Sequence, residues 1–417
     1  MLNSQISNSQ LPPKNQLDEV RQQFPALNQK IRDKNLVYLD SAATTLKPQC
    51  VIDRITRFYS HEAANVHRGA HYLADSATNE FENARENIRC FINAKSIEEV
   101  IFTPGTTGSI NLVASSYGHF LNEGDEIVLT ELEHHANIVP WQVLATQKRC
   151  VLKFIEILPN GEIDLASVEE QITSKAKIVA FSACSNILGT FTPIENIVAR
   201  AKSVGAITLL DAAQYVSQKN VDVQKLGVDF FAFSSHKLFG PFGFGVLYGR
   251  KDLLNKMPVY QTGGSMIDRV ECQQSTYNHL PFKFEAGTPH IAGALGTNAA
   301  LDFLKQFKIE EFFNHEQNLM KMALQELQQI EEIKVFGTSE NKAAIISFTM
   351  NGAHHSDIGQ ILDQQGIATR VGRHCTQPLF KKFNLVGTVR ASISIYNNES
   401  DIAQFIEGVK KAKRMLL

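Results

Sequence analysis

The sequence predicts an α/β protein with a large domain built on a mostly parallel sheet and a smaller C-terminal α+β domain. From residue 36 to about residue 249, short apolar runs alternate with amphipathic stretches. Glycines and chemically distinctive polar residues follow directly after these runs. Loops at the carboxyl ends of parallel strands converge, so this placement indicates one shared site. Beyond about residue 287 the pattern changes to long helical stretches separated by strand-like runs.

The large domain is expected to span residues 36–300. Apolar and β-branched runs of four to six residues are typical of buried strands, and apolar residues at helical spacing indicate helices. Helical periodicity is clear over residues 74–92 and 194–204. The candidate strands cover residues 100–102, 127–129, 178–181, 207–210, 230–233 and 244–248.

The small domain is expected to span residues 301–417, with residues 1–35 forming an N-terminal arm that packs on it. A long helix beginning near residue 292 carries the chain away from the large domain. The elements that follow are helices at 310–330, 356–365 and 400–415 and strand-like runs at 342–350 and 388–395.

The composition describes an ordinary globular protein, with 43% hydrophobic and 20% charged residues among 417. The formal net charge of −2 gives no electrostatic basis for binding nucleic acid or an anionic membrane. No apolar run approaches the roughly 18–20 residues of a membrane span. The first 15 residues lack the apolar segment of a secretory signal and are not rich in arginine. We therefore expect a cytoplasmic enzyme.

The six cysteines form no CxxC pair and show no regular spacing, which disfavours a zinc site or a disulfide framework. We expect no metal site. Most of these cysteines are interpreted as small buried apolar residues, and Cys375 is the exception because of its neighbours. The six are Cys50, Cys90, Cys150, Cys184, Cys272 and Cys375.

Two residues of opposite charge stand at the ends of predicted strands. Lys237 follows the strand at 230–233 and the residues Ser234, Ser235 and His236, and Asp211 ends the run at 207–210. Pyridoxal phosphate requires such a pair, because lysine forms a Schiff base with it and a carboxylate keeps its pyridinium nitrogen protonated. Gln214, three residues after Asp211, is placed to reach the phenolic oxygen of the ring. Helix capping is the alternative role for the aspartate, and Lys237 favours the cofactor.

A glycine- and hydroxyl-rich turn, residues 103–109, follows a strand and opens a helix. Backbone N–H groups and the positive end of the helix dipole make such a turn a phosphate cradle. Thr106 and Thr107 supply its hydroxyl groups. A capped turn without a ligand is the alternative, and a Walker loop is excluded because the required lysine is missing.

His134 and His135 lie together on a turn after the strand at 127–129. Metal binding is disfavoured, because adjacent residues do not share a face and no further ligands occur at metal-binding spacing. In a pyridoxal phosphate site, one imidazole would stack on the pyridine ring and also move protons.

Arg390 lies inside an apolar strand pattern, and a buried arginine needs an anionic partner. The carboxylate of an amino-acid substrate, bound bidentately, is the expected partner. An internal salt bridge is the alternative.

Cys375 follows Arg370, Arg373 and His374 on a loop. Neighbouring positive charges favour the thiolate, the nucleophilic form of cysteine. A thiolate aimed into a pyridoxal phosphate site indicates attack on the side chain of the substrate rather than on its backbone.

Taken together, these motifs resemble the cysteine desulfurases of the SufS/CsdA-like (group II) kind, in the class-V aminotransferase branch of the fold-type-I pyridoxal phosphate enzymes. The resemblance extends from about residue 36 to the end of the chain. It rests on residues 39–43, 65–69, 105–107, 133–141, 185–189, 211–214, 234–240, 263–266, 284–289 and 370–390.

The resemblance implies a homodimer that converts L-cysteine to L-alanine and leaves the sulfur as a persulfide on Cys375. The sulfur would serve iron–sulfur cluster assembly or related sulfur trafficking. Lys237 would bind the cofactor covalently and then move the Cα proton, and His134 would stack on the ring and assist proton transfer.

The resemblance also implies which residues bind the cofactor and the substrate. The cofactor would be held by Thr106, Thr107, His134, Asp211, Gln214, Ser234, His236 and Lys237, with Thr288 coming from the other subunit. Asn186 and Arg390 would bind the substrate carboxylate, and Arg370 and His67 would line the entrance near the thiol loop.

Three positions differ from the family pattern or invite confusion. Arg373 stands where the family often has histidine, and its charge is expected to favour the thiolate further. Ser235 stands where glycine is usual, a change without expected consequence. Cys184, beside Asn186, is expected to be a buried strand-end residue rather than a second nucleophile.

Two alternatives stay open. A selenocysteine lyase or cysteine sulfinate desulfinase would use the same scaffold with less need for Cys375. A catalytically silent scaffold protein is disfavoured because Lys237, Asp211, His134 and Arg390 are all present. Only four residues separate Arg370 from Cys375, which indicates a short, ordered loop. We therefore expect slow turnover that a small acceptor protein of the SufE, SufU or CsdE type accelerates.

Overall fold

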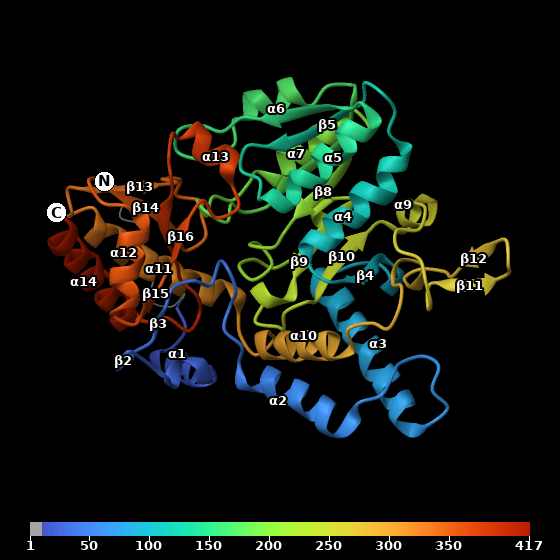
Figure 1. Ribbon diagram of the computed structural model, residues 1–417, viewed down its shortest axis with the longest axis horizontal. Helices are drawn as coiled ribbons and strands as arrows, with labels where there is room; N and C mark the ends of the chain where they lie inside the picture. The colour runs from blue at the N-terminus through green and yellow to red at the C-terminus, as the bar shows by residue number, and fades with distance from the viewer. Residues whose placement is uncertain (1–10) are drawn as a thin grey trace.

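The computed structural model describes residues 11–417, so the first ten residues of the predicted arm lie outside the described residues. A seven-stranded sheet with helices on both faces forms the larger body, and a four-stranded sheet with its own helices forms the smaller one (Figure 1). This arrangement confirms the predicted α/β fold class. The division at residues 35/36 and 300/301 stays a prediction, and the second boundary falls inside helix α10 (Ile291–Leu304).

The large sheet has the strand order β4-β10-β9-β8-β7-β5-β6. Strands β5 to β9 are parallel, and β10 runs antiparallel to both of its neighbours. The six predicted strands are all present, within two residues at each end. The strand that the sequence pattern missed is the edge strand β6, which is largely unburied and therefore lacks an apolar run. The bounds are β4 (Val100–Thr103), β5 (Glu126–Thr130), β6 (Val151–Ile155), β7 (Ala176–Ser182), β8 (Ile207–Asp211), β9 (Phe230–Ser234) and β10 (Gly245–Gly249).

Successive residues of the central strands belong to two different cores. Phe230 and Ala232 of β9 pack with helices α4 (Thr106–Tyr117) and α5 (Val139–Lys148), whereas Phe231 and Phe233 pack on the opposite face. Side chains alternate across a strand, so a strand covered on both faces must be apolar throughout. Figure 1 shows α2 (Gln49–Arg57) and α3 (Tyr72–Ile92) beside α10, on the face opposite α4.

The carboxyl ends of five strands point to the same edge of the sheet. Strand β4 runs in the direction of β9, because both are antiparallel to β10. The loops that follow β4, β5, β7, β8 and β9 therefore converge, as the sequence predicts.

The small sheet is entirely antiparallel, in the order β13-β14-β17-β16. Helices α11 (Ile309–Leu327), α12 (His355–Asp363) and α14 (Glu399–Leu416) cover it and share its core. The sequence pattern predicted two of the four strands; β13 and β16 are short and incompletely buried. The bounds are β13 (Ile333–Phe336), β14 (Ile345–Met350), β16 (Arg370–Gly372) and β17 (Thr388–Ser392).

The N-terminal segment contacts both bodies. In α1 (Lys14–Gln22), Arg21 pairs with Asp401 at 2.8 Å, while Phe24 packs against Phe239 and Phe303.

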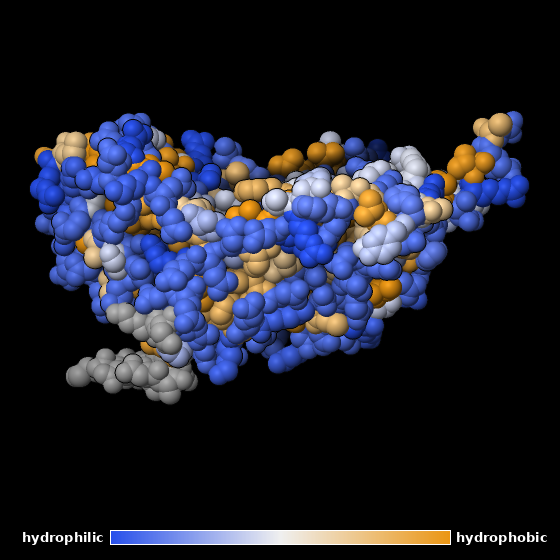
Figure 2. Space-filling view, turned by 90° about the horizontal axis from the view of Figure 1, so that it is seen from below, coloured by the Kyte–Doolittle hydropathy of each residue, from blue (hydrophilic) through white to orange (hydrophobic). Residues whose placement is uncertain are grey.

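A hairpin, β11 (Ile267–Val270) with β12 (Ser275–Tyr277), projects from the far end of the molecule (Figures 1 and 2). The remaining elements are β1 (Lys30–Ile31), β2 (Lys34–Asn35), β3 (Val37–Tyr38), β15 (Ile367–Ala368), α6 (Leu165–Gln171), α7 (Ile194–Ser203), α8 (Val223–Leu226), α9 (Lys251–Lys256), α13 (Gln377–Lys382) and several one-turn helices. Within residues 11–417, no helix is long and apolar enough to cross a membrane.

A fully buried arginine joins α3, β4 and the segment before α10. Arg85 donates to both carboxylate oxygens of Glu285 at 2.6 and 2.9 Å, to Glu82 and to the carbonyl of Val100, and its guanidinium lies 4.0 Å from the centre of the Phe102 ring. Removing one partner of a buried ion pair leaves an uncompensated charge.

We expect Arg85→Met to destabilise the protein by about 3–5 kcal/mol. The matched control is Arg89→Met on the same helix, which breaks a more exposed pair with Glu86 and should cost less than about 1 kcal/mol. Thermal unfolding of the two variants beside the wild type measures both effects. Equal melting temperatures for the two variants would contradict the prediction.

Candidate active site

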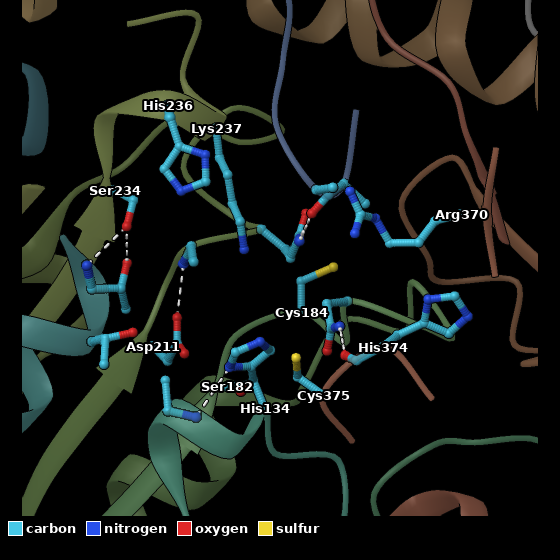
Figure 3. Close-up of a pocket in the computed structure, with 18 of the residues that line it drawn as sticks. His134, Ser182, Cys184, Asp211, Ser234, His236, Lys237, Arg370, His374 and Cys375 are labelled. Atoms are coloured by element: carbon cyan, nitrogen blue, oxygen red, sulfur yellow. Dashed lines mark hydrogen bonds between the residues drawn. The ribbon is translucent and has the colours of Figure 1, made fainter. Parts of the chain in front are cut away.

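The converging loops and the small body enclose a cavity of about 360 Å³. All of the predicted site residues except His67 and Thr288 line it, and Figure 3 shows most of them. Those that line it are Thr106, Thr107, His134, Asn186, Asp211, Gln214, Ser234, His236, Lys237, Arg370, Cys375 and Arg390. The structure thus places together residues that lie up to 284 positions apart in the chain.

His67 and Thr288 lie elsewhere in the single chain. The His67 ring packs against Phe81 and Phe282 at 5.8 and 5.2 Å, and its Nε2 lies 3.6 Å from a carboxylate oxygen of Glu82. Thr288 lines a separate cavity. The prediction gave Thr288 to the site of a second subunit, so its position here neither supports nor contradicts that role.

Lys237 ends a one-turn helix, Ser235–Lys237, that follows β9, and its side chain extends into the cavity (Figure 3). Within residues 11–417, its Nζ has no hydrogen-bond or ion-pair partner. Burial lowers the pKa of Lys237, and the charge of Asp211 partly opposes this shift. An amine with a lowered pKa is both a better nucleophile and a better proton acceptor near neutral pH.

Asp211 is the last residue of β8 and is 6% exposed. Its Oδ1 accepts a hydrogen bond from the backbone N–H of Ala213 at 2.9 Å, so the capping role is present. The described residues provide no hydrogen bond to Oδ2, which therefore stays free for a ligand. Burial raises the pKa of Asp211, and the Ala213 N–H and the Lys237 charge oppose that rise.

The N-terminus of α4 forms the predicted cradle. Thr106 donates its backbone N–H to Ser234 Oγ at 2.8 Å, and the two hydroxyl groups are also 2.8 Å apart. Gly105 has φ of 150°, and a Cβ at Gly245 would lie 2.4 Å from the Gly105 Cα. Two glycines are therefore needed for β10 and the turn to approach this closely. The result is a helix N-terminus with hydroxyl groups at the cavity wall, which suits a phosphate.

His134 accepts a hydrogen bond at Nδ1 from the backbone N–H of Ala136 at 3.0 Å. Burial, followed by the positive charge of Lys237, lowers the pKa of His134 to about 4. The imidazole is therefore neutral at pH 7, with its proton on Nε2.

Glu133 is a structural support that the sequence reasoning missed. Its buried carboxylate accepts hydrogen bonds from Thr130 Oγ1 at 2.5 Å, Asn137 Nδ2 at 2.6 Å, and both the hydroxyl group and the backbone N–H of Ser182. Burial still raises the pKa of Glu133 to about 7 against these donors. The carboxylate fastens the ends of β5 and β7 to the turn that carries His134.

Arg390 is 2% exposed and donates to the carbonyl of Asn186 at 2.8 Å and to Asp40 at 3.2 Å. Arg370 pairs with the same aspartate at 2.8 Å. The internal salt bridge considered as an alternative is therefore present, and Asp40 was not predicted as its partner. Arg390 nevertheless lines the cavity, and its buried Nε has no hydrogen-bond partner among the described residues. Burial lowers the pKa of Arg390 to about 10, so it keeps its charge at pH 7.

Cys375 lies on a tight turn between β16 and α13. His374 and Cys375 have φ of 47° and 58°, and Thr376 N–H closes the turn by donating to Arg373 O at 3.0 Å. Positive φ at a non-glycine residue is strained and needs external support. Here Asn186 Nδ2 donates to the carbonyl of His374 at 2.8 Å. The turn is short and hydrogen-bonded to a neighbouring segment, and Cys375 points into the cavity (Figure 3).

Hydrogen bonds to the loop after β5 also hold this turn. The backbone N–H of His135 donates to the carbonyl of Cys375 at 2.8 Å, and Gln377 N–H donates to His135 Nε2 at 3.0 Å. The other thiol of the cavity, Cys184, is buried as predicted and donates to the carbonyl of Gly189. The same prediction is wrong for Cys50, Cys90 and Cys272, which are exposed, and for Cys150, which is only partly buried. Burial raises the pKa of Cys184 to about 12, so it is a poor nucleophile.

Comparison with known proteins decides the family. The sequence model of the aminotransferase class-V family matches residues 37–405. The chain belongs to the aminotransferase class-V family. The residues of this class-V family member fit pyridoxal phosphate, the predicted cofactor of the family, because the lysine, the buried aspartate and the phosphate cradle all open into one cavity.

The class-V chain is similar to curated proteins over almost its full length. It is 45% identical to a cysteine desulfurase of Serratia proteamaculans, over 96% of this chain and 99% of the relative. It is 47% identical to a probable cysteine desulfurase of Halalkalibacterium halodurans, over 95% and 97%. The crystal structure of the cysteine desulfurase CsdA of Escherichia coli, in an S-sulfonic acid form, superposes with a TM-score of 0.90 at 37% identity over 96% and 99%.

Proposed function

We propose that this class-V enzyme is a cysteine desulfurase that uses pyridoxal phosphate to convert L-cysteine to L-alanine and takes the sulfur onto Cys375 as a persulfide. The observation that carries the proposal is the thiol of Cys375 on an ordered turn at the same cavity as Lys237 and Asp211. The relatives named as cysteine desulfurases support it.

The residues of the cavity divide into groups that would hold different parts of the cofactor. Asp211, through its free Oδ2, would pair with the pyridine nitrogen, and Gln214 lies on the same loop. The phosphate would bind at the N-terminus of α4, and this group consists of Thr106, Thr107, Ser234 and His236. When bound, the cofactor supplies an electron sink that stabilises negative charge on the substrate carbon.

Arg390, which lines the cavity and keeps its charge at pH 7, would bind the substrate carboxylate, with Asn186 beside it. Lys237, with its lowered pKa, would take the Cα proton and return it. The neutral imidazole of His134 would present a flat face to the ring and donate a hydrogen bond from Nε2.

Sulfur transfer requires one nucleophile and one proton. The Cys375 thiolate would attack the substrate sulfur, forming an S–S bond as the C–S bond breaks. The electron pair of the C–S bond stays with the carbon, which takes up a proton and becomes the methyl group of alanine. The substrate sulfur remains on Cys375, so the thiol becomes a persulfide and no external oxidant is needed.

The proposal extends to partners and location. As the family resemblance implies, the enzyme would be a homodimer in which Thr288, which lines a separate cavity in its own chain, serves the site of the second subunit. The persulfide on a short, hydrogen-bonded turn would pass to a small acceptor protein of the SufE, SufU or CsdE type, for iron–sulfur cluster assembly or related sulfur trafficking in the cytoplasm.

The test is alanine and sulfide release from L-cysteine by the purified protein, alone and with a panel of such acceptors. We expect alanine and sulfide, the latter released from the persulfide by a reductant, in equal amounts. Turnover by the enzyme alone should be slow, and one class of acceptor should accelerate it. Hydrogen bonds from His135 and Asn186 hold the Cys375 turn at the cavity, so we expect the acceptor to come to it. No alanine would contradict the activity, and an unchanged rate across the panel would contradict the acceptor.

A further inference from the structure

An aromatic ring packs against His236, one of the residues proposed above to bind the cofactor phosphate. Phe242 lies on the loop between Lys237 and β10, and its ring stacks on the His236 imidazole with 5.5 Å between centroids and 20° between planes. Phe242 is 62% exposed, so the hydrophobic core does not require it. A large apolar side chain held at the surface against an imidazole at a cavity wall indicates a local role.

Lys47 also contacts this ring. Its Nζ lies 5.0 Å from the centre of the Phe242 ring, within the range of a cation–π contact when the amine is protonated. Burial lowers the pKa of Lys47 to about 7. In either protonation state Nζ can donate to the carbonyl of His236 at 3.0 Å and to the carbonyl of Thr45 at 2.6 Å. Lys47 thereby links the ring of Phe242 to the backbone of the residue on which it stacks.

The backbone of His236 is fixed, whereas few contacts fix its ring. The His236 carbonyl accepts hydrogen bonds from Thr45 N–H, from the hydroxyl groups of Thr44 and Thr45, and from Lys47. The ring nitrogen Nδ1 is buried and has no hydrogen-bond partner among residues 11–417. The stack on Phe242 is the ring contact that restricts rotation of the imidazole.

From this arrangement we infer that Phe242, backed by Lys47, is a positioning residue that holds the His236 imidazole in the orientation that binds the cofactor phosphate. The inference rests on the proposed function, which places His236 at that phosphate. Burial, with the charges of Lys237 and Lys47, lowers the pKa of His236 to about 4. The free imidazole is therefore neutral and can donate a single hydrogen bond, which makes its orientation decisive.

The experiment compares cofactor binding by full-length apo-protein, followed by visible absorbance during titration with pyridoxal 5′-phosphate and with pyridoxal, which lacks the phosphate. We expect Phe242→Ala to raise the dissociation constant of pyridoxal phosphate about 2- to 10-fold, the range for loss of one aromatic pair. The dissociation constant of pyridoxal should stay unchanged. Phe242→Tyr should bind like the wild type, and Phe242→Leu, which keeps apolar volume without a ring, should bind like Phe242→Ala.

A double-mutant cycle with His236→Ala tests whether Phe242 acts through the imidazole. We expect Phe242→Ala to cause no further loss of affinity for pyridoxal phosphate when His236 is already alanine. Phe120→Ala, which removes another exposed phenylalanine outside the cavity, is the matched control and should leave binding unchanged.

The outcomes separate this inference from the proposed function. A wild-type protein that binds no pyridoxal phosphate would refute the proposed function itself. Wild-type binding together with unchanged affinity of Phe242→Ala would refute only the positioning role. Three other results would also overturn the positioning role. The first is an equal loss of affinity for pyridoxal and for pyridoxal phosphate in Phe242→Ala. The others are an undiminished effect of Phe242→Ala on affinity in the His236→Ala background, and wild-type affinity of Phe242→Leu.

Discussion

Replacing Lys237 with alanine is expected to abolish covalent retention of pyridoxal phosphate and to reduce alanine formation by at least about 100-fold. Lys237 is the amine at the cavity whose Nζ has no partner among the described residues, and burial lowers its pKa. Its loss removes both the attachment point and the proton acceptor. The measurements are the visible absorption of the purified protein after gel filtration and alanine release from L-cysteine.

The matched control is Lys219→Met. Lys219 is also partly buried, with a pKa lowered by burial, but its ammonium lies 3.8 Å from the centre of the Phe313 ring and does not line the cavity. This variant should stay yellow and active. A Lys237→Ala protein that stays yellow after gel filtration and turns over cysteine at the wild-type rate would refute the assignment of the cofactor lysine.

Replacing Cys375 with alanine is expected to reduce alanine release from L-cysteine to background while the protein keeps its cofactor. The sulfur atom of the substrate has no acceptor without this thiol, because the remaining cavity cysteine, Cys184, is buried and has a pKa raised to about 12. Alanine assay and visible absorbance of the same sample measure both properties.

Two further cysteine variants serve as controls for this experiment. Cys184→Ala removes the buried thiol of the cavity, and Cys272→Ser removes an exposed thiol of the loop between β11 and β12. Both should retain alanine release. If Cys375→Ala releases alanine from L-selenocysteine but none from L-cysteine, the thiol is specific to the sulfur reaction. Undiminished release from L-cysteine would contradict the role of Cys375 and favour the selenocysteine or sulfinate alternative.

Much of the site could be predicted because its residues follow strands that are easily recognised. Lys237 and Asp211 stand directly after buried apolar runs, and the carboxyl ends of parallel strands meet at one edge of a sheet. The edge strand β6 escaped because it is too little buried to need an apolar pattern. The strand β16, before Cys375, escaped because three residues carry no periodicity.

The supporting residues could not be predicted in the same way. Asp40 binds Arg390 from a position 350 residues away, and no local pattern records such a pair. Glu133 stood in a recognised motif beside His134, yet its role depends on two donors of Ser182, which lies 49 residues away on strand β7. The sequence alone does not distinguish an exposed glutamate from one whose buried carboxylate accepts four hydrogen bonds, as Glu133 does.

By itself, the sequence determined the fold class, the family resemblance and the residues that carry chemical groups, because hydrophobic periodicity and strand-end placement are local properties of the chain. Only the tertiary structure decided which of those groups stay free for a ligand. Asp211 uses only Oδ1 to accept the Ala213 N–H, Arg390 is shared with Asp40, and Phe242 stacks on the His236 ring. Pairing, burial and orientation arise from contacts between distant segments, and these exist only once the chain has folded.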